Sequence, residues 1–424
     1  MRAMDRPSQN HRDPWFAPFF QKVLADSKVR EKEEREGSGW EKKTCRAAPR
    51  LGMRGEAPPA RPSHTHAHPL PLSLLSQMIF GTTKGTPFIF PGTGTGGWES
   101  ALTNTLSPGD KVLTFRYGQF SHLWIDMMQR MGLEVEVIEC EWGEGADEAR
   151  LAAALAKDTA KKIKAVAVVH NETTTGVTSD IAGVRAALDG AGHPALLLVD
   201  GVSSIGALDF QFDKWGVDVA VTGSQKALSL PTGLAVLAVS EKALAARAGA
   251  GSKRCYYDWA DQLATNPAGS VPYTPSIPLL YGLQASLDLL KAEGMANVVA
   301  RHARLAEGTR RAAAAWGLDL LCKHPRWRSD SLTVINAPAG IDSNLIVQEA
   351  YRRYNLSIGV GLSKVNGKVF RIGHLGNCDE VMQASALAGT EMALLSAGAK
   401  ITPGAGVGAA VQYWAETSKI IPTR

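Results

Sequence analysis

The chain has 424 residues, of which 45% are hydrophobic and 21% charged, a composition typical of a folded globular protein and not of a disordered or collagen-like one. Its formal net charge is +5. Residues 27–78 supply +4 of it, because ten Lys or Arg stand there against six Glu. The remaining chain is close to neutral, which excludes a broad basic surface for nucleic acid.

The five cysteines are widely spaced, with no Cys-x-x-Cys pair and no zinc-binding spacing with histidine, so we expect reduced thiols. No apolar run approaches the ~18 residues that a membrane helix needs. The N-terminus also lacks the basic start, apolar run and cleavage site of a secretory signal. We therefore expect neither a membrane span nor a bound metal.

Residues 1–26 are expected to form an N-terminal helical segment. After Asp13-Pro14, a typical helix start, apolar residues recur at helical spacing. They are Trp15, Phe16, Phe19, Phe20, Val23 and Leu24.

Residues 27–78 differ from both flanks, with the charge run KVREKEERE followed by a tract rich in Pro, Arg and His. We expect a largely disordered insertion, because such a segment buries too little apolar surface to offset its ordering entropy. His64, His66 and His68 alternate as metal ligands could, but a flexible Pro-rich tract is the simpler interpretation.

Residues 79–293 are expected to form a large α/β domain. Runs such as AVAVV and ALLLV are apolar on both faces, as buried parallel strands are. The predicted strands are 87–90, 111–115, 134–140, 164–170, 195–200, 217–222 and 234–239, and the predicted helices are 98–106, 120–131, 147–157 and 180–190. This alternation predicts a mostly parallel seven-stranded sheet. The last two strands are joined by a segment too short for a crossover helix, which favours an antiparallel pair.

Residues 294–424 are expected to form a smaller C-terminal α+β domain. The predicted elements are a helix at 298–316, a strand at 332–336, a helix at 343–354, a strand near 367–372 and a helix at 380–395. No internal repeat of fixed period is visible.

A glycine-rich loop, PGTGTGG, follows the first predicted strand and precedes a helix. A helix N-terminus of small residues presents free backbone N–H groups and the positive end of the helix dipole, and Thr93 and Thr95 add hydroxyl donors. The loop is therefore a candidate phosphate cradle. It lacks the Gly-Lys-Ser/Thr of a P-loop and the spacing of a dinucleotide fingerprint, and many such loops bind nothing.

Two titratable residues follow predicted buried strands. Asp200 ends the run ALLLVD, at the edge where ligands of open α/β sheets bind, although a turn-capping role would also explain it. Lys226 follows the strand of DVAVTGSQK, where partial desolvation would lower its pKa and favour the neutral nucleophile; a solvent-facing lysine is the alternative. Together with the phosphate cradle, these are the groups that hold pyridoxal phosphate: the lysine forms a Schiff base and the carboxylate pairs with the protonated pyridine nitrogen.

Six motifs resemble those of the class V pyridoxal-phosphate aminotransferases. In chain order they are GTPFIFPGTGTGGWESALTNTLSPGD, VHNETTTGV, LLLVDGVSSIGALDF, VDVAVTGSQKALSLPTGL, PYTPSIPLLYGL and GKVFRIGHLGN. The resemblance covers residues 79–424 and is strongest to the plant-type peroxisomal serine:glyoxylate branch, which is related to the alanine:glyoxylate enzymes. It implies the fold-type I architecture, a large cofactor-binding domain with a smaller C-terminal domain, and pyridoxal 5′-phosphate as the cofactor.

The resemblance also assigns residues to the cofactor. Lys226 would be the Schiff-base lysine and the base for the proton shift, and Asp200 the partner of the ring nitrogen. The other implied contacts are Thr93, Gly94 and Thr95 in the phosphate loop, Val202 and Phe120 on the two ring faces, Thr173 near the phenolic oxygen, Gln225 at the phosphate, and Tyr273 and Thr274 from a neighbouring subunit.

For the substrate, Arg371 in KVFRIG matches the arginine that binds the carboxylate, a task for which a bidentate guanidinium is suited; taken alone it would be an edge-strand surface residue. Arg12 in HRDP matches an arginine that reaches the neighbouring active site, and the resemblance implies an obligate homodimer with shared sites. The family's Gly-Pro-rich N-terminal arm has no counterpart here. Residues 27–78 interrupt the family pattern, either as a lineage-specific loop or as a translated intron.

The implied reaction is ping-pong transfer of the amino group of serine, or of alanine, to glyoxylate, which yields glycine. Small amino and oxo acids are the expected partners, and a peroxisomal location follows from the resemblance alone, since the chain ends in PTR and not in Ser-Lys-Leu. The rival interpretations are a cysteine desulfurase, a phosphoserine aminotransferase and a truncated, non-catalytic paralogue. A desulfurase typically has His before the lysine and a mobile cysteine loop; here Gln225 precedes Lys226 and no such loop is evident.

Overall fold

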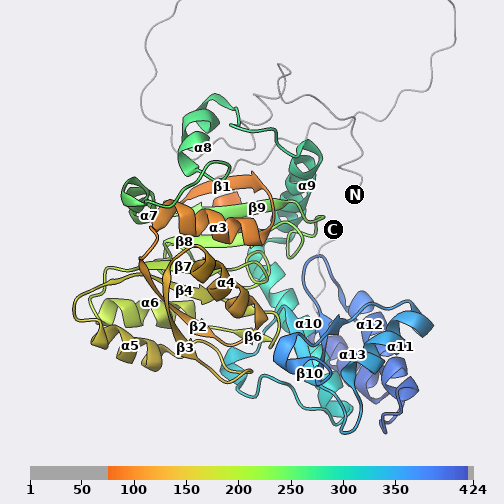
Figure 1. The fold of residues 1–424 in the computed structure, drawn as a ribbon. Helices are drawn as coiled ribbons and strands as arrows, with labels where there is room; N and C mark the ends of the chain where they lie inside the picture. The colour runs from red at the N-terminus through yellow and green to blue at the C-terminus, as the bar shows by residue number, and fades with distance from the viewer. Residues whose placement is uncertain (1–74, 419–424) are drawn as a thin grey trace, which may run out of the picture.

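A computed structural model of the protein describes residues 75–418 (Figure 1). The predicted N-terminal helical segment, Arg12 and most of the expected insertion lie outside the described residues. The last four residues of that insertion, 75–78, are described. Leu75 is buried in the main core, and a helical turn η2 (Ser76–Phe80) leads into the first strand.

The large domain is built on a seven-stranded sheet, as the sequence predicts. Its strands are β1 (Thr86–Pro91), β2 (Lys111–Arg116), β3 (Glu134–Glu139), β4 (Ile163–Val169), β7 (Leu196–Asp200), β8 (Val219–Gly223) and β9 (Leu234–Val239), in the order β1-β9-β8-β7-β4-β2-β3. β9 is antiparallel to both of its neighbours, and the other pairs are parallel. The predicted antiparallel pair is therefore confirmed, and β1, β7 and β8 share one direction.

Helices cover this sheet because its central strands are apolar on both faces. They are α3 (Gly94–Thr105), α4 (Gln119–Arg130), α5 (Glu148–Lys157), α6 (Ile181–Gly190), α7 (Glu241–Ala246), η3 (Arg247–Gly249), α8 (Trp259–Thr265), η4 (Asn266–Ala268) and α9 (Ile277–Glu293). α3 packs on β8 and β9, and α4 packs on β2 and β3; Figure 1 shows both helices in front of the sheet. A short hairpin of β5 (Asn171–Glu172) and β6 (Val177–Thr178) follows β4.

The C-terminal region forms a smaller unit with its own core. A three-stranded antiparallel sheet of order β10-β12-β11 contains β10 (Leu332–Asn336), β11 (Gly359–Val360) and β12 (Val369–Gly373). Its helices are α10 (Met295–Ala315), η5 (Pro325–Trp327), α11 (Ser343–Tyr354), η6 (Ser363–Val365), α12 (Glu380–Ser396) and α13 (Ala405–Thr417). Trp316, Phe370 and Trp414 lie in the core between them. In Figure 1 this unit is the blue part of the chain, and α10 leads from the large sheet into it.

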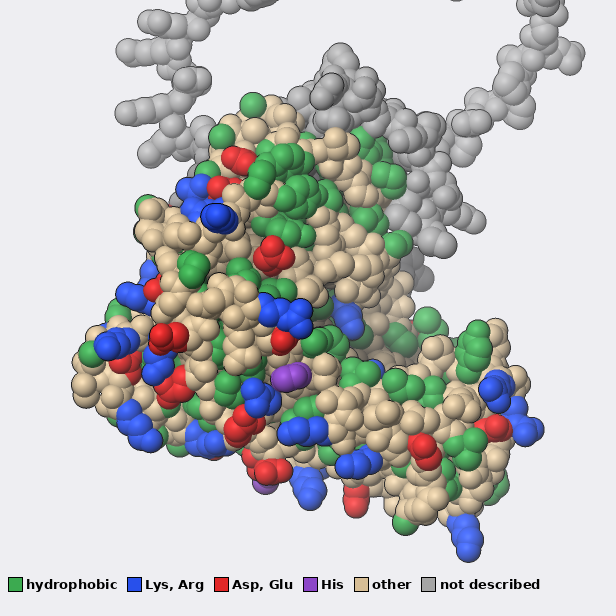
Figure 2. Space-filling model, in the orientation of Figure 1, with side chains coloured by type: hydrophobic (Ala, Val, Ile, Leu, Met, Phe, Trp, Pro, Cys, Tyr) green, Lys and Arg blue, Asp and Glu red, His purple; other side chains and the backbone are tan. Residues whose placement is uncertain are grey.

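The surface shows no dominant charge on the face seen in Figure 2. Basic and acidic side chains are interspersed there over both units of the described chain, in keeping with its near-neutral composition. Within residues 75–418, no helix has the length and hydropathy needed to cross a bilayer.

Candidate active site

The three features singled out in the sequence meet at one edge of the large sheet. The glycine-rich loop follows β1, Asp200 ends β7 and Lys226 follows β8, and these three strands run in the same direction. Val202 joins two of them, because its backbone N–H donates to Asp200 Oδ1 at 2.8 Å while a Cβ placed on Gly94 would lie 2.5 Å from its Cγ2. The carboxyl ends of neighbouring strands thus bring the loop, the acid and the amine together.

The glycine-rich loop is the first turn of a helix. Helix α3 begins at Gly94, earlier than predicted, and Thr93 is its N-cap, with Oγ1 accepting from the Gly96 N–H at 3.5 Å. The first helical hydrogen bond runs from Gly97 N to Thr93 O at 3.0 Å. The N–H groups before Gly97 therefore have no helical acceptor, and the helix dipole adds positive potential there. This arrangement is suited to bind an anion.

Glycine is required at two positions of this turn by close packing. A Cβ on Gly94 would meet Val202 at 2.5 Å, and one on Gly96 would lie 2.3 Å from the Tyr257 hydroxyl oxygen. Any larger side chain would push the backbone N–H groups away from these neighbours. The small residues thus keep the loop close to the residues that follow β7.

Asp200 is a buried carboxyl that makes no ion pair with any of residues 75–418. It is 4% exposed, and the hydrogen bond from Val202 N reaches only Oδ1. Burial, with the nearby charge of Glu172, raises the pKa of Asp200 to about 7, against the effect of that hydrogen bond and of Lys226. A cation placed beside this carboxyl would stabilise its ionised form.

Lys226 is a half-buried residue on the short turn that follows β8. Within residues 75–418 its Nζ makes no hydrogen bond. Burial, and then the positive charge of Arg371, lower the pKa of Lys226, which Asp200 only partly opposes. The turn is closed by Ser224, whose Oγ donates to Pro231 O at 2.8 Å and accepts from Leu234 N at 3.1 Å. The amine is held near the sheet edge in a form that favours nucleophilic and basic chemistry.

Arg371 reaches this site from the small domain. It lies on β12, the central strand of its sheet and not an edge strand. Its Nη1 donates to Thr173 O at 3.1 Å and its Nε to Val360 O at 2.8 Å. Burial lowers the pKa of the guanidinium, while the charge of Glu172 opposes the shift. Neither acceptor is an anion, so the positive charge remains available to a carboxylate ligand.

The remaining predicted residues on this side of the fold surround the same place. Thr173 Oγ1 donates to Ser203 Oγ at 3.0 Å, next to the segment that carries Val202. Phe120 lies at the start of α4, packs against the main core and donates its backbone N–H to Glu172 at 3.4 Å. Gln225 Oε1 is buried and has no hydrogen-bond partner within residues 75–418.

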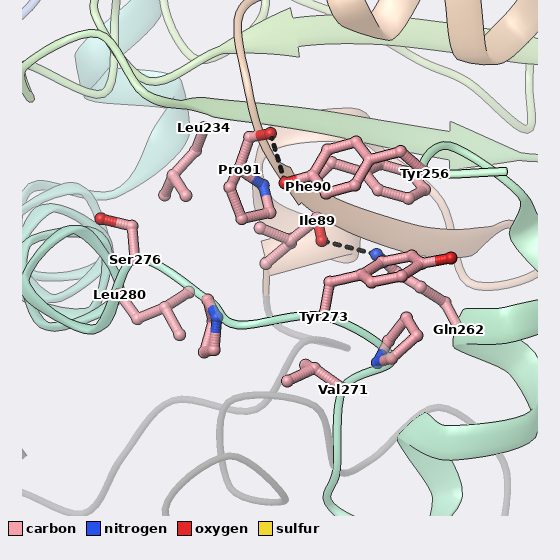
Figure 3. A pocket seen from close by; sticks show the side chains of 12 residues that line it. Ile89, Phe90, Pro91, Leu234, Tyr256, Gln262, Val271, Tyr273, Ser276 and Leu280 are labelled. Carbon is pink, nitrogen blue, oxygen red and sulfur yellow. Dashed lines mark hydrogen bonds between the residues drawn. The ribbon is translucent and has the colours of Figure 1, made fainter. Parts of the chain in front are cut away.

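Tyr273 and Thr274 lie apart from this convergence, on an exposed segment before α9. Tyr273 donates a hydrogen bond to Asp261 Oδ2 at 3.2 Å and packs on the Tyr256 ring at 5.2 Å between centroids. Tyr256 in turn donates to Pro91 O at 3.1 Å, at the start of the glycine-rich loop (Figure 3). These rings border a small, largely apolar pocket, which Val271, Pro272 and Leu280 also line. That Tyr273 and Thr274 contact the phosphate site of a second subunit stays a prediction.

Two buried residues at the site were missed by sequence reasoning. Glu172 is fully buried and accepts hydrogen bonds from Ser121 N at 2.9 Å and Thr174 N at 3.0 Å, so it anchors the start of α4. Burial raises its pKa. Asn171 connects the two domains through its side-chain amide. Both lie in the motif HNETTT, which reads as a polar turn and gives no local signal of burial.

These residues fit pyridoxal phosphate. The α3 N-terminus offers N–H groups to a phosphate, Asp200 lacks a cation that a protonated pyridine nitrogen supplies, and Lys226 offers a desolvated amine. Buried polar atoms on the surrounding elements also lack partners within the described chain. They are Thr222 Oγ1 and Gln225 Oε1.

Aminotransferases are among the known proteins that share this fold and sequence pattern. The family model "Aminotransferase class-V" matches residues 80–362. The serine–glyoxylate aminotransferases of Methylorubrum extorquens and Arabidopsis thaliana are 57% and 55% identical to this chain, over 82% of its length and over 87% and 86% of theirs. An L-aspartate–glyoxylate aminotransferase of Paracoccus denitrificans is 51% identical over 80% of this chain and 86% of that protein. The crystal structure of ureidoglycine–glyoxylate aminotransferase from Bacillus subtilis matches with a TM-score of 0.80 and 25% identity, covering 98% of this chain and 94% of that one.

Proposed function

The chain belongs to the class-V aminotransferase family and is a pyridoxal-phosphate-dependent aminotransferase, and on this premise we propose that it moves the amino group of serine to glyoxylate. The products are hydroxypyruvate and glycine. The observation that carries the proposal is the identity of more than half of the aligned residues with relatives named for this reaction. The convergence of Lys226, Asp200 and Arg371 supports it from the geometry.

The cofactor, when bound, supplies an aldehyde carbon that takes up the donor's amino group and a ring that accepts the electron pair left at the substrate Cα. The glycine-rich turn of α3 would hold its phosphate, with Thr93 and Thr95 as side-chain donors and Gln225 beside them. Val202 and Phe120 would hold the ring between them. Asp200 would pair with the ring nitrogen, and this ion pair keeps the proton on that nitrogen.

Lys226 performs the proton transfer in this proposal. Its depressed pKa gives a larger neutral fraction at physiological pH than an exposed lysine has. A neutral amine can accept the proton from the substrate Cα and give it back on the other side of the shift. The charge of Arg371 lowers the pKa of Lys226 and the charge of Asp200 raises it, so the two effects partly cancel.

Arg371 binds the carboxylate that every donor and acceptor of this reaction shares. Two main-chain acceptors, Thr173 O and Val360 O, fix the plane of the guanidinium. A planar fork held in this way matches two carboxylate oxygens and orients the substrate Cα toward Lys226. The same contact serves serine, alanine and glyoxylate, so it does not choose the donor.

Aspartate is the second candidate donor, because a relative with 51% identity is named for it. A second carboxylate would need a second cation, and Arg371 is the one cation whose charge acts on Lys226 within residues 75–418. Arg12 of a neighbouring subunit is a further cation in this proposal, so we rank aspartate below serine on the higher identity of the relatives named for serine.

The finer features of the family resemblance are part of the same proposal. A homodimer would bring Tyr273 and Thr274 of one subunit to the phosphate site of the other, which their exposure in the single chain favours. Arg12 would contribute to the substrate site in that assembly. Peroxisomal photorespiration is the proposed setting, supported by the similarity to the Arabidopsis protein. Gel filtration with light scattering tests the dimer, and a fluorescent fusion at the N-terminus tests the location.

The decisive experiment incubates purified protein and pyridoxal phosphate with glyoxylate and one donor at a time. Serine, alanine, aspartate and phosphoserine are compared by the rate of glycine formation. The proposal expects serine to give the highest kcat/KM and alanine the next. No glycine from any donor, in protein that binds the cofactor, would instead support the non-catalytic paralogue.

A further inference from the structure

The side-chain amide of Asn171 joins the two domains at one buried point. Asn171 is 2% exposed and lies on β5 of the large domain. Its Nδ2 donates to Ser203 Oγ at 2.9 Å and to Ser331 Oγ at 3.0 Å, and its Oδ1 accepts from Thr178 Oγ1 at 2.8 Å and from Ser329 Oγ at 2.6 Å. All four hydrogen-bonding positions of the amide are thus used.

On the large-domain side, the joint ends at the cofactor-binding residues. Ser203 follows Asp200 by three positions and is 5% exposed. It donates to the Asn171 backbone carbonyl at 2.8 Å and accepts from Thr173 Oγ1 at 3.0 Å. Asn171 and Ser203 therefore hold each other through two contacts, one to the main chain and one to the amide.

On the small-domain side, the joint ends at the strand pair that carries Arg371. Ser331 directly precedes β10, in which Val334 pairs with Arg371 of β12. The Ser331 carbonyl also accepts from His374 N at 3.1 Å, just beyond the end of β12. A displacement of Ser331 therefore moves both strands of this pair.

These contacts form a closed ring of hydrogen bonds between the two domains, because Arg371 Nη1 donates to the backbone carbonyl of Thr173 at 3.1 Å. We propose that Asn171 is a positioning residue that sets the place of Arg371 relative to the cofactor-binding side of the large domain, and hence the place of the substrate carboxylate. This inference rests on the proposed transamination, in which Arg371 binds that carboxylate.

This ring of hydrogen bonds makes the position of Arg371 sensitive to the side chain of Asn171. Without the amide, Ser203 keeps its bond to the residue-171 carbonyl, and Ser329 and Ser331, 3.2 Å apart, pair with each other. The side-chain link of the joint is then lost, and Thr178 Oγ1 loses its acceptor. The main-chain hydrogen bond from Ser329 N to Gly176 O, 3.0 Å, still connects the two domains beside it, so we expect a shift of Ser331 and not a separation of the domains. Misplacement of a binding group by about 1 Å can cost on the order of 100-fold in rate.

The test compares Asn171→Ala and Asn171→Asp with Gln383→Ala. Gln383 is a matched control, because it is a buried amide whose Nε2 donates to Thr309 at 2.9 Å, between two helices of the small domain. Asn171→Asp keeps acceptors for Thr178 and Ser329 and loses both donors. Steady-state kinetics with serine and glyoxylate are combined with inhibition by glycolate, a carboxylate without an amine, and with hydrogen exchange of the cofactor-free protein.

We expect Asn171→Ala to raise both KM values and the glycolate inhibition constant about tenfold or more, with a smaller fall in kcat, as loss of substrate binding does. Amide exchange in residues 329–336 and 371–374 is expected to become faster. Asn171→Asp should lie between this variant and the wild type, and Gln383→Ala should lower stability without changing KM.

Unchanged KM values and unchanged exchange in Asn171→Ala would overturn the proposal, as would changes no larger than those of Gln383→Ala. If the wild-type chain transaminated none of the donors, the proposed function would fail on its own. Exchange would still decide the joint in that case: faster exchange confined to residues 329–336 and 371–374 supports it, and no difference overturns it.

Discussion

Arg371 donates a hydrogen bond to the backbone carbonyl oxygen of Thr173, 3.1 Å away, across the boundary between the two domains. The cation that we propose to bind the substrate carboxylate and the segment expected near the cofactor's phenolic oxygen are therefore in direct contact. A carbonyl acceptor orients the guanidinium without neutralising it, which a carboxylate would do. The small domain can thus present a full positive charge to the large domain.

Replacing Arg371 by lysine is expected to raise KM for both amino and oxo substrates by about 10- to 100-fold, because an ammonium cannot reproduce the two-pronged contact worth roughly 1.5–3 kcal/mol. The kcat should change less. Steady-state kinetics with serine and glyoxylate measure both. Arg353→Lys is the control, since Arg353 is an exposed residue of α11 paired with Glu349. A KM that stayed at the wild-type value would remove Arg371 from the substrate site.

Replacing Lys226 by alanine is expected to abolish turnover, with a loss on the order of 10⁴-fold or more, since the variant lacks both the nucleophile and the base. The protein should still fold, because the amine makes no hydrogen bond within the described residues. Glycine formation and the visible absorbance of the lysine-linked cofactor are the two measurements. Retention of both would show that the lysine assignment is wrong.

Asp200 makes the stability of the cofactor-free protein depend on pH. Burial raises its pKa from 3.8 to about 7, so the folded state binds this proton more tightly than the unfolded chain does. Its contribution to the free energy of unfolding is fully present below about pH 4 and is lost as the pH rises to about 7. Asp200→Asn cannot ionise and should escape this loss.

The measurement is the melting temperature of cofactor-free wild type and Asp200→Asn near pH 4 and near pH 8. The melting temperature of Asp200→Asn, relative to that of the wild type, should be higher near pH 8 than near pH 4. Adding pyridoxal phosphate should stabilise the wild type more than the variant, because the ring nitrogen is then the missing cation. The opposite pH trend in the difference would mean that Asp200 is already stabilised as an anion without cofactor.

Replacing Gly94 by alanine is expected to weaken pyridoxal phosphate binding by about tenfold or more, because the new methyl would lie 2.5 Å from Val202 and must displace it or the loop. Gly190→Ala is the matched control. A Cβ there meets nothing within 4 Å, and alanine in the α6 helix should stabilise by about 0.5–1 kcal/mol. Cofactor titration followed by absorbance compares the two. Equal affinities of the two variants for pyridoxal phosphate would mean that the glycine-rich loop does not bind the phosphate.

The sequence predicted the elements of the large sheet because their signal is local. Seven apolar runs became seven strands, and the short link before Leu234 correctly indicated an antiparallel β9. The meeting of Asp200 and Lys226 also followed, since both stand at the carboxyl ends of strands. The order of the strands in the sheet was not predicted, because it depends on which strands pair and not on any single segment.

Other elements had weak or misleading patterns. Helix α13 contains two glycines in its first half and is held by packing against α10 and α12, so its propensity alone did not reveal it. Helix α3 was predicted to start at Trp98, yet its first turn is the glycine-rich loop itself. Asn171 and Glu172 gain their roles from partners 160 and 51 residues away, which no local pattern encodes.

The short closed turn between β8 and β9 restricts the movement of Lys226. Gly92 N binds Gly233 O at 2.9 Å and Ser224 holds both ends of the turn, so an amine displaced by an incoming donor cannot travel far. Its effective concentration at the reacting carbon then exceeds that of any free amine in solution. Once the amino group has left with the second product, Lys226 would be placed to rejoin the cofactor's aldehyde carbon as an intramolecular event, which would favour release of that product amine.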